Sequence, residues 1–423
     1  MTYHDRHYDE DLDLFDEART EQIPKVRARS SSGGGSRGGS GRRKPPPPPP
    51  KKRRSFLWVG MVVVLALIAV GGYYGYKQLT GIGDYDDFAG KGTEDVIIQV
   101  KGGDSTGDIA ATLADAGVVA STRAFVVASE SNAKVRGVQP GYYVMKKKAS
   151  GAAAVTKIID PKSQVGQFDI KGGAQLESIT AQSGQPIDGI IAKLAKASCA
   201  ELNGKSTCVT PEQLAAVASG GDLAKLGVPD WAIPDAGKAE PKRRLEGLIV
   251  PGVYDVRPGS TPDELMTQLV TASAQKLQAA NMPTVADNTG YTPYQILTIA
   301  SLVEKEAITD DFGKVSRVTY NRLHEGMRLQ YDSTINYVLD RPAIRTKESD
   351  REEVGPYNSY ANNGLPPTPI GSPSAEALKT AVAPEQGSWL YFVKCEKDGT
   401  SCFATTNEEH LANIQKAKQN DAY

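Results

Sequence analysis

Histidine is scarce in this sequence: a chain of 423 residues contains only four. Two of them, His4 and His7, lie in an N-terminal tail of unusual composition, which leaves His324 and His410 for the rest of the chain. A metal site rich in histidine is therefore nearly excluded, and we assign no metal ligand. Catalytic triads that rely on histidine are limited to the same two positions.

An excess of charge of either sign is also lacking, with 49 Lys+Arg against 50 Asp+Glu. The balance hides an asymmetry, because residues 1–54 hold 13 basic and 8 acidic side chains, whereas residues 55–423 hold 36 and 42. The larger part is therefore net acidic. This argues against nucleic acid as its main partner, since phosphate binding requires a basic face. The length allows two or three domains.

One long hydrophobic run is present, at residues 56–76, where no side chain is charged. As a helix it would span roughly 31 Å, which matches the hydrocarbon core of a bilayer. The basic residues 51–54 precede it and place the N-terminus in the cytoplasm. A cleaved signal peptide is the alternative, but the preceding tail is long and no A-x-A site follows the run. We predict a single signal-anchor helix at residues 55–76 of a plasma-membrane protein, with residues 77–423 outside the cytoplasm.

The tail before this run, residues 1–54, has a composition that cannot form a buried core. A tract of Ser, Gly and Arg is followed by six prolines at residues 45–50. Such segments are flexible or extended, so we predict a disordered cytoplasmic tail. It either docks onto anionic lipid or a cytoplasmic partner, or serves as a block of charge that sets the topology.

Cysteine is as rare as histidine, and all four cysteines follow the hydrophobic run. Asp398-Gly399 suits a two-residue hairpin turn, which would set Cys395 directly opposite Cys402 at a spacing that a disulfide accepts. Cys199 and Cys208 would close a loop of ten residues. We favour these two local disulfides; a zinc site is the alternative, although neither spacing resembles a zinc ribbon.

A weak repeat follows the hydrophobic run, at residues 96–119, 167–184 and 254–270. In each segment an apolar strand leads into a glycine turn, then into capping residues and helical spacing of Ile and Leu. Ser105 or Thr106 is expected to cap the first helix. Units of this size bind glycans in some proteins and are ordinary scaffolding in others. The first helix would bury one stripe, made of Ile109, Leu113 and Val118.

Residues 292–307 predict a helix with a complete start signal. Thr292 suits the N-cap, Pro293 suits the first helical position, and Gln295 completes a capping box. Three charged residues close this helix. At ~100° per residue, Glu304 falls inside the apolar arc, Lys305 on the opposite, solvent side, and Glu306 at the far edge of the arc.

A carboxylate on the inner face of a helix, as predicted for Glu304, costs free energy unless it is paired or protonated. A general acid requires such surroundings. A buried glutamate bonded to a backbone group or to a nearby arginine explains the pattern equally well.

Several separate motifs occur here in the order found in a known family: LEGLIVPGVYDV, LTIASLVEKEA, VSRVTYNRLHEGMRLQYDSTINYVL, GPYNSYANNGLPPTPIGSPS, LYFV and FATTNEEH. Over residues 93–420 the chain resembles the MltG (YceG-like) family of endolytic murein transglycosylases. The resemblance implies an α+β fold with a LysM-like subdomain at residues 77–165. A second strand–helix unit and linker would follow at 166–244, and a catalytic domain at 245–423.

The resemblance also implies a reaction. The family cleaves the MurNAc-β-1,4-GlcNAc bond of peptidoglycan strands and leaves a 1,6-anhydroMurNAc end, without cofactor. Its catalytic glutamate, matched to the first Glu of the E-K-E motif, would be Glu304. Peptidoglycan strands are the implied partner, as are synthases or division proteins beside which the enzyme would terminate glycan elongation. A non-catalytic, membrane-anchored glycan-binding scaffold of the cell-wall machinery is the alternative.

Other family-motif positions are expected to shape the sugar groove. In MRLQYDST three polar residues alternate along an extended stretch and could project to one side. Tyrosine and asparagine follow in the loop before GLPPTPI, where they could contact sugar or simply pack as a lid. The expected groove residues are Arg328, Gln330, Asp332, Tyr357, Asn358 and Tyr360.

Overall fold

The computed structural model describes residues 85–181, 184–339, 348–352 and 355–422, with isolated positions between 65 and 71. The chain divides into two units, residues 1–81 and 82–423, of which the second is described below. The predicted tail and most of the predicted signal-anchor helix lie outside the described residues. Within the described part of the chain, no helix combines the length and apolar character needed to cross a membrane.

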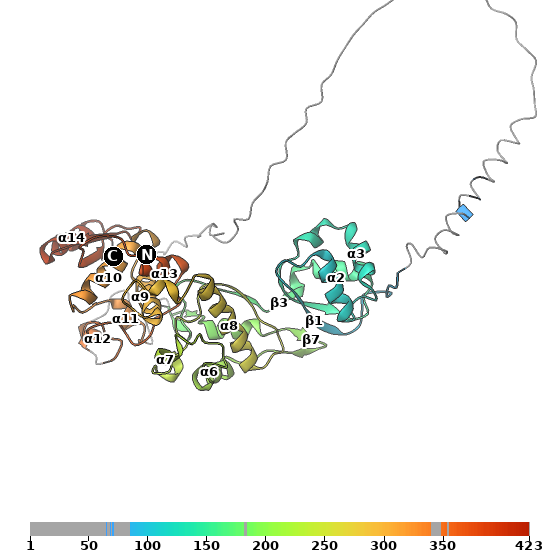
Figure 1. Cartoon of the computed structure of the whole chain (residues 1–423), viewed down its shortest axis with the longest axis horizontal. Coiled ribbons are helices and arrows are strands. Elements are labelled where there is room, and N and C mark those ends of the chain that lie inside the picture. Colours follow the sequence, from blue (N-terminus) through green and yellow to red (C-terminus); the bar gives the residue numbers. More distant parts are fainter. Residues whose placement is uncertain are drawn as a thin grey trace, which may run out of the picture. The chain divides into compact units, whose positions relative to one another are not determined.

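The N-terminal part of the second unit is a small α+β layer built on an antiparallel sheet in the order β1-β2-β3 (Figure 1). Ile98 lies opposite Tyr143 in the β1–β2 register. Three helices pack against this sheet, and their shared core contains the fully buried Leu113, Phe125 and Met145. The elements are β1 (Asp95–Val100), α2 (Thr106–Asp115), α3 (Thr122–Glu130), β2 (Gly141–Lys146), α4 (Gly151–Ile158) and β3 (Gln164–Val165).

Helix α2 begins as its sequence predicts. The Ser105 hydroxyl accepts the backbone N–H of Asp108, and the Asp108 carboxylate accepts the backbone N–H of Ser105, which completes a capping box. The predicted stripe of Ile109, Leu113 and Val118 is buried. The first strand–turn–helix unit is therefore confirmed.

The contact between α3 and α4 depends on a glycine. A Cβ built on Gly151 would lie 2.2 Å from the backbone oxygen of Ala124, so Gly151→Ala is expected to lower the free energy of unfolding by about 2–3 kcal/mol. Gly107→Ala in α2 is the matched control. The nearest atom there is 3.5 Å away, so the gain in helix propensity should raise stability by about 0.5–1 kcal/mol. Denaturant unfolding of both variants measures the difference; equal effects would contradict this packing.

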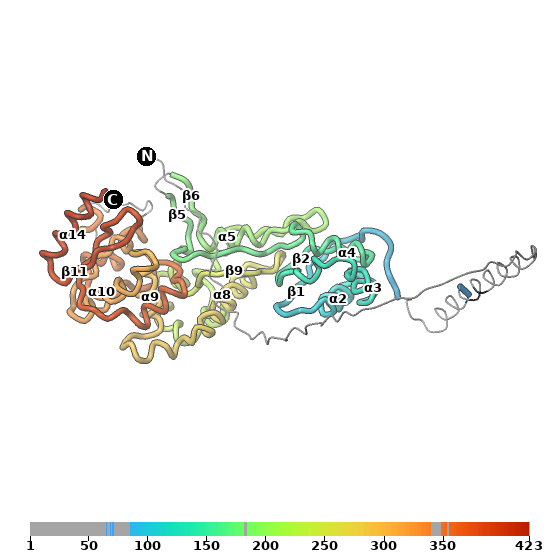
Figure 2. The backbone as a smooth tube through the Cα atoms, turned by 90° about the horizontal axis from the view of Figure 1, so that it is seen from above, coloured from blue at the N-terminus to red at the C-terminus, as the bar shows by residue number. Residues whose placement is uncertain are grey.

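The rest of the unit combines short antiparallel ribbons with a group of packed helices (Figure 2). The ribbons pair β4 (Gln167–Ile170) with β9 (Gly252–Asp255), β5 (Ile179–Thr180) with β6 (Pro186–Ile187), β7 (Glu201–Leu202) with β8 (Lys205–Ser206), and β10 (Tyr391–Lys394) with β11 (Ser401–Ala404). The helices are α5 (Ile190–Ala197), α6 (Pro211–Gly220), α7 (Ile233–Ala236), α8 (Pro262–Ala279), α9 (Pro293–Glu306), α10 (Phe312–His324), α11 (Asp332–Asn336), α12 (Glu348–Glu352), α13 (Ala375–Val382) and α14 (Asn407–Gln419).

The other two predicted strand–turn–helix units have different outcomes. At residues 254–270 the unit forms, because β9 leads through Gly259 into α8, which Thr261 caps. At residues 167–184 the strand forms but no helix follows; the chain enters β5 instead, so that prediction was wrong. Paired β-branched residues favour the extended form there: Ile179 lies opposite Ile187 across the ribbon.

Helix α9 lies at the centre of the larger core. The predicted capping box is present, with Thr292 and Gln295 bonded reciprocally and Pro293 at the start. The helix is buried on every side from Ile296 to Val303, and α10, α11 and α13 pack against it. Since even its polar Thr298 and Ser301 are buried, the helix is less amphipathic in the fold than its sequence period indicates.

Both local pairs of cysteines are joined: Cys199 to Cys208, and Cys395 to Cys402. The predicted hairpin register was wrong, because Cys402 lies opposite Val393 and not opposite Cys395. The turn is longer than two residues. The N–H of Cys395 donates to the oxygen of Thr400 at 3.0 Å, and the Asp398 carboxylate accepts the N–H of Thr400 at 2.9 Å.

Candidate active site

The last turn of α9 places its three charged residues in different surroundings. Glu304 faces the start of α13 together with Gly172. The Glu304 carboxylate accepts both the backbone N–H of Ser374, at 3.0 Å, and the Ser374 hydroxyl. Ser374 is itself the N-cap of α13. A Cβ on Gly172 would lie 2.0 Å from Glu304 Oε1, so the loop leaves no room for a larger residue. These contacts tie α9 to α13.

Lys305 does not point to solvent, and that prediction was wrong. Its ammonium donates to the backbone oxygen of Gly173 at 2.6 Å. Burial lowers the pKa of Lys305, while the nearby carboxylates of Glu246 and Glu304 oppose this shift. The period of a single helix does not reveal that the loop after β4 covers this side of it.

Glu306 lines a cavity of about 680 Å³, and Glu304 is not among the lining residues. Glu306 Oε1 accepts the backbone N–H of Ser333 at 3.2 Å. Burial raises the pKa of Glu306; the backbone N–H of Ser333 and the charge of Lys394 counteract the shift. The carboxyl group is therefore held toward its protonated form at the edge of an open space, as a proton donor requires.

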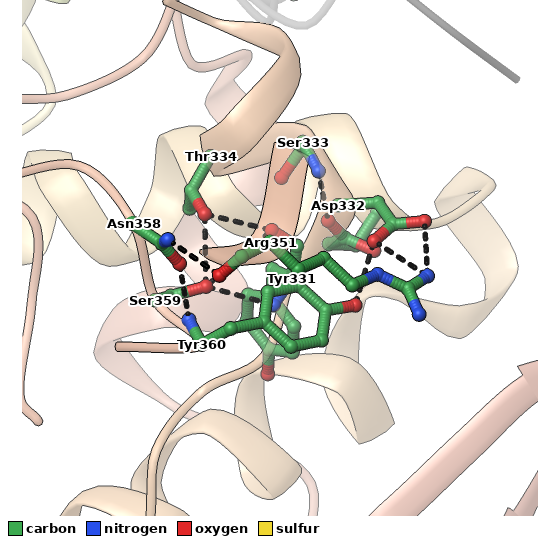
Figure 3. A network of polar contacts seen from close by, with 9 residues as sticks. Tyr331, Asp332, Ser333, Thr334, Arg351, Asn358, Ser359 and Tyr360 are labelled. Carbon is green, nitrogen blue, oxygen red and sulfur yellow. Dashed lines mark hydrogen bonds and ion pairs between the residues drawn. The ribbon is translucent and has the colours of Figure 1, made fainter. Parts of the chain in front are cut away.

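Asp332, Arg351 and Tyr360 line this cavity together with Glu306. These three residues belong to a network of polar contacts (Figure 3). The Asp332 carboxylate accepts the Tyr360 hydroxyl at 2.6 Å and pairs with the Arg351 guanidinium at 3.2 Å. The same guanidinium lies 4.8 Å from the centre of the Tyr360 ring. Burial, followed by the bond to Asp332, raises the pKa of Tyr360. The network therefore fixes side chains that present polar groups to the cavity.

Three of the six expected groove residues line this cavity: Gln330, Asp332 and Tyr360. Arg328, Gln330 and Asp332 were predicted to alternate along an extended stretch, and that prediction was wrong. Gln330 has a φ of 53°, in the left-handed region, and Asp332 already begins α11. Arg328 does not line the cavity; its guanidinium donates to the backbone oxygen of Tyr360 at 3.0 Å.

Tyr357 and Asn358, which were expected to contact sugar, are buried and do not line this cavity. Tyr357 is 3% exposed, and its hydroxyl lies 2.9 Å from that of Thr368. Asn358 is 4% exposed; its amide donates to the oxygen of Arg351 and accepts the N–H of Tyr360. Both side chains make internal bonds that shape the loop and bring Tyr360 to the cavity.

Other lining residues of the cavity come from β10 and α14. Arg322, on α10, is 6% exposed and donates to the backbone oxygens of Leu390 and Leu329. His410, which lies in α14, stacks on Tyr391 with ring centres 5.2 Å apart. Burial lowers the pKa of His410. Within the described ranges, no three His, Cys, Asp or Glu residues gather as a metal site would require.

Sequence reasoning missed several members of the cavity, among them the polar or charged Ser333, Arg351, Tyr391 and Lys394. Ser333 and Tyr391 lie inside family motifs, so membership in a motif could have identified them as candidate site residues. Arg351 and Lys394 come from segments whose place relative to α9 depends on the tertiary fold.

The model of the YceG-like family matches residues 98–416. The endolytic murein transglycosylase of Streptococcus pneumoniae serotype 2 (strain D39 / NCTC 7466) is 27% identical over 372 residues, which cover 84% of this chain and 64% of that protein. The chain thus spans less than two thirds of this relative's length. The endolytic murein transglycosylase of Bacillus subtilis (strain 168) is 29% identical over 329 residues, 77% of this chain and 84% of that protein.

Among solved structures, a yceG-like protein from Listeria monocytogenes, known from a crystal structure at 2.6 Å, is 25% identical. The match covers 75% of this chain and 99% of that chain, with a TM-score of 0.47.

Proposed function

The chain belongs to the YceG-like family, and from this premise we propose that it is a lytic transglycosylase of peptidoglycan. The substrate would be the MurNAc-β-1,4-GlcNAc bond inside a glycan strand, and the product a 1,6-anhydroMurNAc end. The names of the pneumococcal and Bacillus relatives support this reaction. An open polar cavity with one carboxyl group held toward its protonated form supports it on chemical grounds.

We assign the acid–base role to Glu306, in place of the Glu304 expected from the sequence. The single observation that carries this choice is that Glu306 lines the cavity, whereas the Glu304 carboxylate is bound by Ser374. A general acid must come within hydrogen-bond reach of the bond that it cleaves. Glu304 would serve the fold by joining α9 to α13.

The reaction then needs one carboxyl group. Protonated Glu306 donates its proton to the glycosidic oxygen as the C1–O bond breaks and positive charge develops on the sugar ring. The resulting carboxylate takes the proton of the C6 hydroxyl of the same sugar, whose oxygen bonds to C1. The proton returns to Glu306, and no water is consumed. Because the nucleophile belongs to the substrate, a second carboxylate is not obligatory.

Other groups in the cavity would hold the strand. Gln330 and the Asp332–Tyr360 pair offer donors and acceptors to sugar hydroxyls and N-acetyl groups. Tyr391 offers an aromatic ring, fixed by its stacking on His410. Lys394 lies close enough to Glu306 to stabilise the carboxylate formed after proton donation.

The activity is tested by incubating the full-length chain with uncrosslinked nascent glycan and analysing the products by mass spectrometry. Anhydro ends are expected, with no matching reducing ends from hydrolysis. If the chain binds the glycan but yields no anhydro ends, the scaffold alternative holds and the enzymatic proposal is wrong.

We also propose that residues 55–76 anchor the protein in the plasma membrane, with a cytoplasmic tail and residues 77–423 outside. The two disulfides support this orientation, because such bonds persist in oxidising compartments. Residues 77–165 would act as a LysM-like subdomain, 166–244 as a linking unit, and 245–423 as the catalytic domain beside peptidoglycan synthases. Protease added outside intact protoplasts is expected to remove residues 77–423 and spare an N-terminal tag; a protected C-terminal part would contradict this topology.

A further inference from the structure

A second carboxyl group, Glu246, is buried away from the catalytic cavity. It is 3% exposed. Its Oε2 accepts the backbone N–H of Leu176 at 3.3 Å and the Tyr337 hydroxyl at 3.0 Å. Its Oε1 has no hydrogen-bond partner among the described residues. A buried acceptor without a partner costs free energy. The surroundings of Glu246 therefore indicate what this carboxyl group could bind.

Glu246 lines a separate pocket of about 290 Å³. One wall is the chain that leads into β5, from Gln175 to Thr180; the other follows α11, from Tyr337 to Leu339. Lys242 and Arg243 lie beside Glu246. The Arg243 guanidinium is 4.4 Å from the centre of the Tyr337 ring, so this side of the pocket is held in place.

The chemistry of the lining selects the kind of ligand. Two basic residues, Lys242 and Arg243, balance two acidic ones, Glu177 and Glu246, so the pocket suits neither an anion nor a cation. Gln175, Ser178 and Thr180 add side chains that both donate and accept hydrogen bonds. An uncharged group rich in hydroxyls and amides matches these side chains, and the volume is that of a small site.

The pocket adjoins the catalytic cavity along the chain. Asn336, the last residue of α11, lines the cavity, and the next residue, Tyr337, lines the pocket. Glu306 and Glu246 thus accept hydrogen bonds from opposite ends of the α11 segment: Ser333 donates to Glu306, and Tyr337 donates to Glu246. Ser333 and Tyr337 are four residues apart, which corresponds to a rise of roughly 6 Å along a helix.

We propose that this pocket is a further subsite of the enzyme, which binds an uncharged N-acetylated sugar ring of the strand whose neighbouring bond lies in the catalytic cavity. The inference rests on the proposed function and extends it. Occupation of the pocket would favour long strands over short ones, because only a strand of sufficient length reaches both places.

Peptide-free MurNAc–GlcNAc oligosaccharides of four and eight sugars test the subsite with the full-length chain. The wild type is expected to have a higher kcat/KM for the longer strand. Thr180→Trp, which fills the pocket from one wall, and Val338→Trp, which fills it from the other, are each expected to lower the ratio of the two values by about tenfold. Ile187→Trp is the control, since Ile187 is exposed on the neighbouring strand β6 and does not line the pocket.

The outcomes separate the subsite from the activity. If the wild type yields no anhydro ends from either strand, the proposed function fails; binding of the two oligosaccharides to the Glu306→Gln chain then still tests the pocket. If both filling variants fold and keep the wild-type ratio, the subsite is wrong. The subsite is also wrong if the two filling variants lower the ratio of the kcat/KM values only for strands that carry stem peptides. The pocket would then bind peptide and not sugar.

Discussion

Glu306→Gln is expected to lower the rate of anhydro-end formation by about 10³-fold while the chain remains folded. The amide has nearly the shape of the carboxyl group but supplies no proton, and a positioned acid or base accounts for roughly 10²–10⁴ in rate. Liquid chromatography with mass spectrometry, applied to products from uncrosslinked glycan, measures the loss. Binding of the glycan should persist, so the effect is expected in kcat.

Glu304→Gln is the matched control, two residues away on the same turn. Turnover is expected to stay within severalfold of the wild type. Stability should fall by about 1–2 kcal/mol, because the charge-assisted bonds from Ser374 become neutral ones. The opposite result, loss of turnover in Glu304→Gln with Glu306→Gln still active, would restore the assignment made from the sequence.

The choice between Glu304 and Glu306 shows what the helical spacing of residues in a sequence can predict and what it cannot. The capping signals at Thr292 and Pro293 predicted where α9 begins, because a cap is made by neighbours in sequence. The helical angles predicted for Glu304 and Lys305 depend only on their spacing along α9. They did not say that the loop at Gly172 and Gly173 and the start of α13 cover that side of the helix. Those contacts join residues 70 or more positions apart.

For the expected groove residues, too, the sequence could not predict which side chains the tertiary fold buries. The sequence placed Gln330, Asp332 and Tyr360 in a shared region, and all three line the cavity. It could not separate them from Tyr357 and Asn358, which have similar chemistry and lie in the same motif. The difference is burial: the bonds of Tyr357 to Thr368 and of Asn358 to Arg351 turn both side chains into the protein.

Turn geometry limited the prediction of the C-terminal hairpin. The Asp-Gly pair correctly marked the turn, and Gly399 has a positive φ of 95°. The Asp398 carboxylate, however, binds the N–H of Thr400, and the Glu396 oxygen accepts the N–H of Gly399. These local bonds form a longer loop than a two-residue turn and shift the strand register.

Glu246→Gln is expected to change how stability depends on pH. Burial raises the pKa of Glu246 to about 7 in the folded chain, opposed by the bonds from Leu176 and Tyr337 and by the charges of Lys305 and Arg243. The pKa of a glutamate in an unfolded chain is about 4.3. The folded state therefore holds its proton more tightly. The stability due to this proton is complete below the unfolded pKa and is lost as the pH rises through the folded one.

Between pH 5 and pH 8 the wild type should lose about 2–3 kcal/mol through this group, and Glu246→Gln should not. Guanidinium unfolding of both proteins at the two pH values measures the difference. Glu177→Gln is the control, because Glu177 lines the same pocket but is exposed. If Glu246→Gln and the wild type lose stability equally over this range, Glu246 is already ionised at pH 5. The carboxylate would then be held by Lys305 and Arg243 as a buried ion.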